Sequence, residues 1–427
     1  MTPNFFSVIE ETFPIPGRFR SKLPFDVAEL SRLLTCERGE RDIGYLNRPN
    51  LLSAYLRYFL PWNVFRLCRL FSLIAGASAS SAGFSASPTS LSTGLAGFSA
   101  SSIGRNTLPL FIDGDAVTDL GSGPLTLPLA LWIAFPELRR TKLEFRCVDK
   151  SAAALDAGHK LFKALCAASG AETAWKIKAI HASMEEPLRG KPAKLVSAIN
   201  VFNEVSAGIY TGGRLERIAQ KAADLLERHC AANGSILAME PGNPQGGAFI
   251  TALRAALLER GRPPAAPCPH AGPCPMHANV STGFHGEKQK HQKNKKAKWC
   301  HFAFDTEAAP PALHKLSIAA GIPKERATLS FLLAGPVTAG QVQGADSART
   351  DGSAAPNLLS IRIISDVFPV SGGKGGTGRY GCSRKGMVLV TGSKAQLMAA
   401  VSGTLPELPF PADERRDPKS GALVISL

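Results

Sequence analysis

The sequence lacks any long apolar run of the kind that crosses a membrane. Its longest uncharged stretch, residues 70–104, contains 35 residues, but 11 of them are serines and several are glycines, which makes it too polar for a bilayer. Residues 1–20 mix glutamates and arginines with apolar residues and show no secretory signal pattern. We therefore expect no membrane partner and no secretion.

The cysteine pattern offers little support for disulfides. The chain has nine cysteines, an odd count, and no compact Cys-x-x-Cys zinc knuckle. Five of them stand singly, mostly in apolar runs, where we expect buried thiols. Without a secreted disulfide framework, the cysteines predict a reducing, cytoplasmic location.

Acidic residues are scarce relative to basic ones. Only 19% of the residues are charged, yet 49 Lys and Arg face 34 Asp and Glu, which leaves a net charge of +15. Such a surplus favours polyanionic partners, because counterions are released when phosphates are neutralised. An apolar content of 44% excludes a wholly disordered chain. We expect a globular protein that binds nucleic acid, with a merely basic soluble enzyme as the alternative.

The composition changes along the chain and predicts four regions. Residues 1–75 show helical apolar spacing, with Pro61 expected to end a helix. Residues 76–106 are rich in Ser, Ala and Gly and predict a flexible linker or disordered loop. Residues 107–262 are expected to form one α/β domain, and residues 263–427 a metal-binding loop with a smaller β-rich domain.

In the α/β region, apolar runs of strand length alternate with segments of helical pattern. Strands are predicted over 116–120, 143–148, 195–201 and 235–239, and helices over 126–135, 151–168, 215–232 and 247–259. The helix over 215–232 is expected to end at Asn233-Gly234. This alternation predicts a parallel sheet covered by helices on both faces. Later apolar runs predict the strands of the C-terminal domain, at 328–333, 358–364, 387–390 and 422–425.

A glycine-rich turn follows the first predicted strand. The segment Asp119-Leu-Gly121-Ser-Gly123-Pro opens a helix, and its small residues let backbone N–H groups approach a ligand closely. Asp149 ends the next strand, so both features fall at the carboxyl edge of the sheet, where a carboxylate can accept the hydroxyls of a ribose. An acidic residue before Gly-x-Gly, without the Gly-x-Gly-x-x-Gly pattern of dinucleotide sites, favours S-adenosylmethionine.

Two further strand ends carry polar residues that would line the same crevice. Asn203 and Glu204 follow the third predicted strand, and Glu240 follows the fourth. Capping of the next helix is an equal alternative for Asn203 and Glu204, and Glu240 has a solvated turn as its alternative. The sequence shows no Asn-Pro-Pro-aromatic signature of amino methyltransferases and no catalytic base, so it assigns no catalytic residue.

Four of the cysteines form a candidate metal site. Cys268 and Cys274 stand six residues apart in a loop bracketed by prolines, which lower the entropy lost when ligands converge. Cys300 follows, and Cys382 lies far downstream. Four thiolates suit an iron–sulfur cluster or structural zinc, and nearby histidines keep a mixed zinc site open. Residues 285–298 hold six lysines against one glutamate and predict a phosphate contact or a solvated loop.

Taken in order, these motifs resemble the methyltransferase-like assembly factors of the small ribosomal subunit, which occur in bacteria and mitochondria. The likeness covers about residues 40–390 and is carried by Asp119-Leu-Gly-Ser-Gly-Pro, Asn203-Glu204, Glu240-Pro-Gly, Cys268-Pro-His-x-Gly-Pro-Cys274-Pro and Trp299-Cys-His-Phe302. Leu125 departs from the pattern, since the family usually has a further glycine there. A side chain at that place could crowd the methionine end of the cofactor.

The resemblance implies a Rossmann-like methyltransferase fold that binds S-adenosylmethionine. The candidate cofactor-binding residues are Asp119, Gly121, Gly123, Asp149, Asn203 and Glu204. The resemblance also implies a four-iron four-sulfur (4Fe–4S) cluster held by Cys268, Cys274, Cys300 and Cys382. It further implies binding to 16S-type rRNA of the small ribosomal subunit, in support of translation, and we expect a monomer apart from the ribosome. The leading hypothesis is an assembly factor with little or no catalysis. An active RNA methyltransferase and a zinc-stabilised small-molecule methyltransferase are the alternatives.

Overall fold

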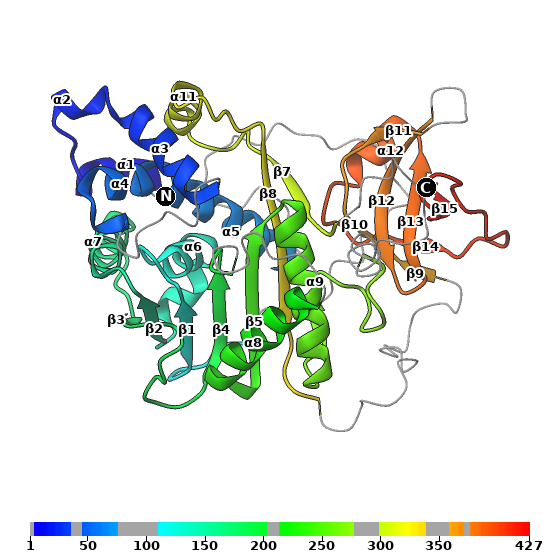
Figure 1. Ribbon diagram of the computed structural model, residues 1–427, viewed down its shortest axis with the longest axis horizontal. Helices are drawn as coiled ribbons and strands as arrows, with labels where there is room; N and C mark the ends of the chain where they lie inside the picture. The colour runs from blue at the N-terminus through cyan, green and yellow to red at the C-terminus, as the bar shows by residue number, and fades with distance from the viewer. Residues whose placement is uncertain are drawn as a thin grey trace.

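The structure is a computed structural model of the 427-residue chain. It describes residues 4–35, 45–75, 110–202, 213–276, 299–338, 358–370 and 376–427. Figure 1 shows a group of N-terminal helices, a large central sheet and a smaller C-terminal sheet. The Ser/Ala/Gly-rich segment, Asn203, Glu204 and the lysine-rich run all lie outside the described residues. Within the described stretches, no helix combines the length and the apolar character that a membrane crossing demands.

The N-terminal region is helical, as the apolar spacing predicts. It comprises α1 (Phe5–Thr12), α2 (Gly17–Arg20), α3 (Leu23–Thr35), the 3-10 turn η2 (Tyr45–Asn47), α4 (Pro49–Ala54), the π-helical turn η3 (Tyr55–Phe59) and α5 (Leu60–Ala75). The expectation that Pro61 ends a helix is wrong, because α4, η3 and α5 follow one another without a break and this continuous helical run contains Pro61. The π-helical turn before it widens the backbone where the proline ring would otherwise meet the carbonyl of Arg57.

The central sheet has eight strands in a Rossmann-like order. The strands are β1 (Ala116–Leu120), β2 (Glu144–Asp149), β3 (Lys176–His181), β4 (Ala193–Ile199), β5 (Cys230–Pro241), β6 (Pro264–Ala266), β7 (Phe302–Asp305) and β8 (Arg326–Ala334). Their order is β3-β2-β1-β4-β5-β8-β6, with β7 also beside β8. The first five run parallel, and β8 is antiparallel to β5. Because the strand order reverses between β1 and β4, we expect a ligand crevice at their carboxyl ends.

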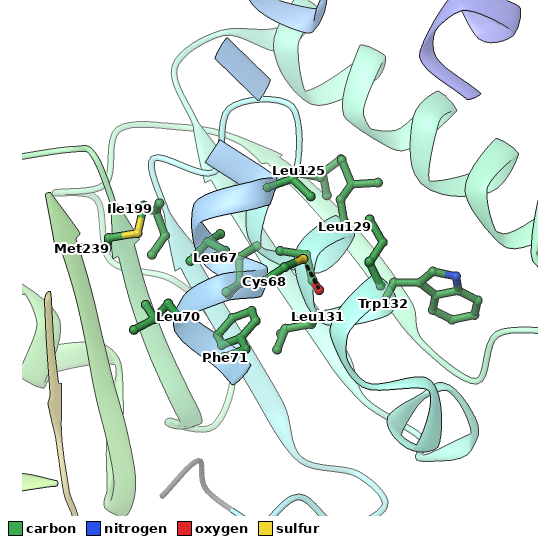
Figure 2. Close-up of a cluster of buried hydrophobic side chains, with 14 of the residues drawn as sticks. Leu67, Cys68, Leu70, Phe71, Leu125, Leu129, Leu131, Trp132, Ile199 and Met239 are labelled. Carbon is green, nitrogen blue, oxygen red and sulfur yellow. Dashed lines mark hydrogen bonds between the residues drawn. The ribbon is translucent and has the colours of Figure 1, made fainter. Parts of the chain in front are cut away.

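Helices cover both faces of this sheet, as predicted. They are α6 (Thr126–Ala134), α7 (Ala152–Ala168), α8 (Arg214–His229) and α9 (Pro244–Glu259), with the 3-10 turn η5 (Pro136–Arg140) after α6. Successive side chains of a strand point to opposite faces. In β5, Met239 therefore joins an apolar cluster with α5, α6 and α7, whereas Ala238 joins the cluster with α8 and α9. Figure 2 shows the first cluster, in which Phe71 of α5 lies near Leu131 of α6.

Two predictions within this region need correction. The strand β3 was missed because it lies at the sheet edge with mostly exposed side chains, so no continuous apolar run marks it. The helix α8 ends at His229 and not at Asn233-Gly234, because β5 begins at Cys230 and includes both of those residues.

A separate β-rich sheet lies near the C-terminus, which confirms that part of the fold prediction. Its region contains β9 (Leu358–Ser360), β10 (Arg362–Ile363), β11 (Phe368–Pro369), β12 (Thr377–Ser383), β13 (Gly386–Gly392), α12 (Lys394–Ala399), β14 (Glu407–Pro409) and β15 (Leu423–Ser426). The main sheet runs β10-β12-β13-β15, and a hydrophobic core of its own lies against it. The assignment of residues 328–333 to this domain is wrong. They belong to β8, which pairs with β5, so the large sheet continues past residue 262.

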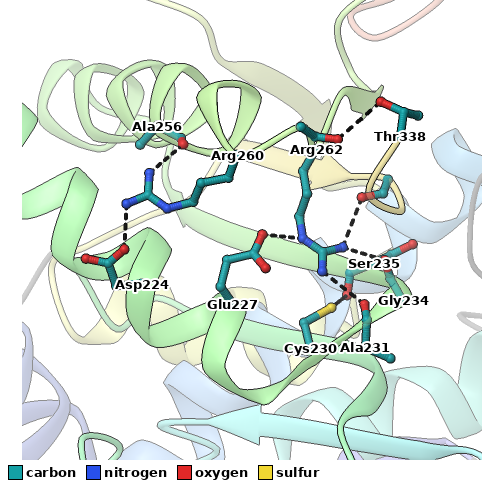
Figure 3. Close-up of polar contacts among 12 residues, drawn as sticks. Asp224, Glu227, Cys230, Ala231, Gly234, Ser235, Ala256, Arg260, Arg262 and Thr338 are labelled. Atoms are coloured by element: carbon teal, nitrogen blue, oxygen red, sulfur yellow. Dashed lines mark hydrogen bonds and ion pairs between the residues drawn. The ribbon is translucent and has the colours of Figure 1, made fainter. Parts of the chain in front are cut away.

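Arg262 lies at the point where the sequence changes character, and it is buried. Its guanidinium donates to the carbonyls of Ala231 at 2.9 Å, Gly234 at 2.8 Å and Gly335 at 3.3 Å, and it pairs with Glu227 of α8. Figure 3 shows how these contacts gather the end of α8, the start of β5 and the chain after β8 around one side chain. The buried guanidinium of Arg262 therefore links these segments at the antiparallel end of the sheet.

Candidate cofactor crevice and cysteine cluster

The glycine-rich turn after β1 has the backbone that its residues predict. Gly121 has φ +68° and Gly123 has φ +53°, both in the left-handed region that favours glycine. A Cβ on Gly121 would lie 2.5 Å from a methyl group of Val201, so nothing larger than hydrogen fits there. A Cβ on Gly123 would meet only the hydroxyl of Tyr55, at 4.0 Å. The turn is therefore packed on the Gly121 side and open on the Gly123 side.

Asp149 is bound to this turn as well as to the following helix. Its Oδ2 accepts the Gly123 N–H at 2.8 Å, and its Oδ1 accepts the Ser151 N–H at 2.8 Å. Burial raises the pKa of Asp149, while the backbone donors act in the opposite direction. Each carboxylate oxygen has a further lone pair, so a half-buried Asp149 can still accept ribose hydroxyls.

Asp119 lies beneath the turn. Its side chain is 1% exposed, and its two oxygens accept the hydroxyls of Ser122 and Ser197, each at 2.6 Å. Burial raises the pKa of Asp119 from its ordinary 3.8 to about 6, even though both serines favour the charged form. Asp119 therefore acts on the turn indirectly, because it binds Ser122 and so supports the turn from beneath.

The raised pKa of Asp119 makes a pH-dependent stability effect testable. Because the folded state disfavours the charged carboxylate, the wild-type chain loses stability relative to Asp119→Asn as the pH rises from about 4 to about 6. A shift of this size corresponds to about 3 kcal/mol at most. Chemical unfolding of both proteins at several pH values between 4 and 7.5 measures the difference, and parallel stability profiles would refute it.

Three further residues, Asn203, Glu204 and Glu240, are predicted to line the crevice. Asn203 and Glu204 lie outside the described residues, so their role in the crevice stays a prediction. Glu240, at the end of β5, is fully buried and its Oε1 accepts the Phe202 N–H at 2.8 Å. It is therefore a structural brace between two strand ends, not the solvated turn residue of the alternative interpretation.

The expectation that Leu125 crowds the cofactor is not met. Leu125 adopts φ +60°, the left-handed conformation that explains why glycine suits this position. Its side chain is completely buried and lies in the apolar cluster of Figure 2. A Cβ on Gly158 of α7 would lie 2.5 Å from its Cδ1, so the side chain packs against α7.

Sequence analysis missed two residues of the N-terminal region that lie at the crevice. The Tyr55 hydroxyl lies nearest the open side of Gly123, and the Asn47 side chain accepts a hydrogen bond from the Ser151 hydroxyl at 3.3 Å. Tyr55 begins the π-helical turn η3, a kind of irregularity that is frequent at functional sites. Only the contact between distant segments reveals these two positions, because nothing in the local pattern marks them.

The structure places the four cysteines predicted as metal ligands within electrostatic range of one another. Cys268 and Cys274 lie in the loop after β6, Cys300 precedes β7, and Cys382 lies in β12 of the C-terminal sheet. Burial and the other three thiols, which lie within electrostatic range, raise the pKa of Cys300 well above its ordinary value. The pKa of Cys382 is raised by burial and by Cys268 and Cys274. The ring of His270 lies among them, with Nε2 3.6 Å from the Cys382 sulfur.

Arg254 of α9 supports the cysteine loop from the side of the central sheet. Its Nε donates to the Cys268 sulfur at 3.2 Å, and its Nη2 donates to the carbonyls of His270 at 2.9 Å and Gly272 at 2.7 Å. Burial raises the pKa of the Cys268 thiol, and the Arg254 guanidinium acts in the opposite direction, towards the thiolate. Arg254 therefore both shapes the loop and favours the ligand form of Cys268.

Arg362 supports the same loop from the C-terminal sheet. It stands opposite Cys382 in the pairing of β10 with β12. Its guanidinium donates to the carbonyls of Pro267 at 2.7 Å and Gly403 at 2.5 Å. Burial lowers the pKa of Arg362 to about 10, and the neighbouring thiols act in the opposite direction. Sequence analysis did not single out either arginine.

These residues fit an anionic metal–thiolate centre. Four soft sulfur ligands suit iron–sulfur or zinc chemistry, and a centre with four thiolates carries net negative charge that two buried guanidinium groups can offset. Among the described residues, no three His, Cys, Asp or Glu side chains are drawn together closely enough to hold a single metal ion. The four thiols therefore lie near one another, but the protein fold alone does not arrange them as the ligands of one metal ion.

The chain was also compared with known proteins. A family model described as "Mitochondrial small ribosomal subunit Rsm22" matches residues 114–338, more than half of the chain. Among curated proteins, none matches this sequence. The matched range contains the glycine-rich turn, Asp149 and three of the four clustered cysteines.

Three solved structures to which the chain is similar are methyltransferases. The geranyl diphosphate C-methyltransferase of Streptomyces coelicolor A3(2) is 12% identical over 54% of this chain and 76% of its own, with a TM-score of 0.28. A SAM-dependent methyltransferase of Geobacter sulfurreducens is 13% identical over 53% and 86%, with a TM-score of 0.26. The ribosomal protein L11 methylase of Lactobacillus delbrueckii subsp. bulgaricus is 16% identical over 36% and 63%, with a TM-score of 0.24. The methyltransferase-like fold of this chain is carried by its own strand order.

Proposed function

Because this chain belongs to the mitochondrial small ribosomal subunit Rsm22 family, we propose that it binds the small ribosomal subunit and its RNA during assembly. The observation that carries the proposal is the family match over residues 114–338. The net charge of +15 supports it, because a basic surface gains affinity for RNA through counterion release. The reducing, cytoplasmic location and the monomeric state stay predictions from the sequence.

The proposal includes S-adenosylmethionine in the crevice at the ends of β1 and β2. Gly121 and Gly123 would let the backbone approach the cofactor, and Asp149 would accept its ribose hydroxyls. The bound cofactor would supply an activated methyl group. The chain's own contribution is the position of the ligand, since Asp149 is fixed by two backbone donors and Tyr55 limits the open side of the turn.

The proposal also includes a 4Fe–4S cluster held by Cys268, Cys274, Cys300 and Cys382. Support comes from the electrostatic proximity of these four cysteines, which lie up to 114 residues apart in the chain, and from two buried arginines beside them. Such a cluster would link the loop after β6 with strand β12 of the C-terminal sheet. Its role here is structural, because metal binding to ligands from distant segments contributes directly to folding.

The association with the ribosome has a direct test. We expect the chain to sediment with small-subunit precursors in a fractionated lysate. Its absence from every precursor fraction would remove the assembly role and leave only the fold and the candidate sites.

An active RNA methyltransferase is the second candidate, and the open side of Gly123 favours it. Methyl transfer needs chiefly the orientation of donor and acceptor, so the lack of an evident base does not exclude activity. Incubation with labelled S-adenosylmethionine and small-subunit RNA decides between the candidates. Proven cofactor binding without incorporation would leave the non-catalytic assembly factor.

The Gly123→Ala variant tests whether the cofactor lies over the turn. Its Cβ would enter the space between the turn and Tyr55, so we expect affinity for S-adenosylhomocysteine to fall by about tenfold or more, which corresponds to about 1.4 kcal/mol. Gly170→Ala is the matched control, because Gly170 also has a left-handed backbone (φ +59°) but has nothing within 4 Å of its Cβ position at the end of α7.

Titration calorimetry and thermal unfolding separate binding from stability in these variants. Both substitutions should cost about 1–2 kcal/mol of stability through the left-handed backbone. Gly121→Ala should cost more, because its Cβ meets Val201. Unchanged affinity in Gly123→Ala would place the cofactor elsewhere.

A further inference from the structure

Residues 13–25, the basic aromatic segment, join α1 to α3 through the short helix α2. The segment contains Arg18, Arg20 and Lys22 and has no Asp or Glu. All three of these cations are exposed. Figure 1 shows α2, which carries both arginines, at the outer edge of the N-terminal helices. A large partner in solution can therefore reach this segment directly.

Two phenylalanines of the basic aromatic segment face solvent. Phe25 is 71% exposed and Phe19 is 47% exposed. Among the residues that the structure describes, these are the two aromatic members of the set of exposed large apolar side chains. The Arg18 guanidinium lies over the Phe19 ring, 4.8 Å from its centre. A single exposed apolar residue needs no explanation, but two phenyl rings six residues apart among three cations form a defined pattern.

The backbone presents both rings in a fixed arrangement. The Phe19 N–H donates to the Pro16 carbonyl at 2.9 Å, and the Lys22 N–H donates to the Phe19 carbonyl at 3.1 Å. Phe25 lies in the first turn of α3, in which Val27 is completely buried. Residues two apart lie on nearly opposite sides of a helix, so burial of Val27 turns Phe25 towards solvent. Little backbone entropy would therefore be lost when a partner binds the rings.

The cations of the basic aromatic segment are available to an anionic partner. Among the described residues, neither Arg18 nor Lys22 has a carboxylate within ion-pair distance. Arg20 lies 3.9 Å from Glu10, whose other oxygen is bound more closely by Arg57, at 2.7 Å. Exposed cations gain affinity for phosphates because counterions are released when the charges meet. The segment thus suits a partner that offers negative charge beside flat apolar groups.

We propose that the basic aromatic segment binds single-stranded RNA, with bases stacked on Phe19 and Phe25 and phosphates contacted by Arg18 and Lys22. An unpaired strand offers both free base faces and phosphates, whereas a duplex keeps its base faces inside the stack. This contact rests on the proposed function, to which it adds a surface and the form of RNA bound. An anionic membrane is the competing partner, but membrane binding favours a continuous apolar helix face, and α2 has only four residues.

The first arm of the test measures binding of the full chain to a single-stranded RNA oligomer without self-complementarity. Phe19→Ala and Phe25→Ala should each weaken binding about tenfold, because stacking of one base on an aromatic ring has this magnitude. Phe25→Tyr should restore the affinity, since it keeps the ring, whereas Phe25→Leu should not. Met398→Ala is the matched control, because Met398 is also an exposed apolar side chain (56%) but lies in α12, and it should bind as the wild type does.

The second arm repeats these measurements at several salt concentrations. Arg18→Ala and Lys22→Ala should each lower the slope of log affinity against log salt by about 0.7, whereas the phenylalanine variants should keep the wild-type slope because they remove no charge. RNA binding by the wild type together with unchanged affinity in Phe19→Ala and Phe25→Ala would overturn this contact and leave the proposed function standing. No RNA binding by the wild type would overturn both.

The third arm uses vesicles of phosphatidylglycerol and phosphatidylcholine. We expect the phenylalanine variants to differ from the wild type in RNA affinity and not in vesicle binding. If the variants lose vesicle binding and keep the wild-type affinity for RNA, the basic aromatic segment is a membrane contact and the RNA contact is refuted.

Discussion

Substitution of Cys268 by serine is expected to remove the metal centre. The purified wild-type chain should contain about four iron atoms and show the broad visible absorbance of an iron–sulfur cluster. Cys268→Ser should lose nearly all of that iron, because a serine hydroxyl is a poor replacement for a thiolate beside Arg254. The melting temperature should fall as well, since ligand convergence contributes folding free energy. Elemental analysis after anaerobic purification measures the outcome.

Cys166→Ser is the matched control for this experiment. Cys166 is a buried cysteine that lies in α7 and belongs to the apolar core. It should keep full iron content and lose only modest stability. Cys382→Ser tests the fourth ligand, and full iron content in that variant would contradict the four-cysteine centre. A colourless protein with bound zinc would instead favour the zinc-stabilised alternative.

Replacement of Arg262 by methionine is expected to cost about 3–5 kcal/mol of stability. The side chain is 1% exposed, and its loss would leave Glu227 without its partner and three carbonyls without their donor. Methionine fills much of the same volume, so the effect reports lost polar contacts more than a cavity. The effect should appear as a lower denaturant midpoint in chemical unfolding.

The control for this substitution stands two residues earlier in the chain. Arg260 pairs with Asp224 at 2.5 Å, but the Asp224 side chain is 63% exposed, so solvent screens the pair (Figure 3). Arg260→Met should therefore cost no more than about 1 kcal/mol. Equal losses in the two variants would mean that burial does not set the strength of the Arg262 contacts.

The elements of the central sheet could be predicted where each strand is buried on both faces. Most residues of β1, β2, β4 and the later part of β5 are buried, and among the helices between them α7 and α9 begin at the side-chain caps Ser151 and Asn243. β3 could not be found in this way, because an exposed edge strand has no continuous apolar run. Likewise, β8 is apolar enough to be recognised as a strand, but its partner β5 lies in another region of the chain.

The residues of the candidate sites likewise divide into those that a local sequence pattern predicts and those that only folding brings together. Gly121, Gly123 and Asp149 could be predicted because turn chemistry and strand ends are local features. The resemblance to a family supplied Cys382, since no spacing rule links it to Cys300. Asn47 and Tyr55 could not be predicted, because they approach the turn only through the packing of the N-terminal helices.

The sequence by itself determined the strand and helix alternation, the left-handed turn and the basic surplus. These depend on neighbouring residues or on composition, and packing does not change them. The tertiary structure decided which charges are buried and what faces them. Arg254 and Arg362 meet the cysteines, whereas Arg262 meets Glu227 and three carbonyls. Electrostatic interactions and desolvation act through space, so their outcome depends on segments that only folding brings together.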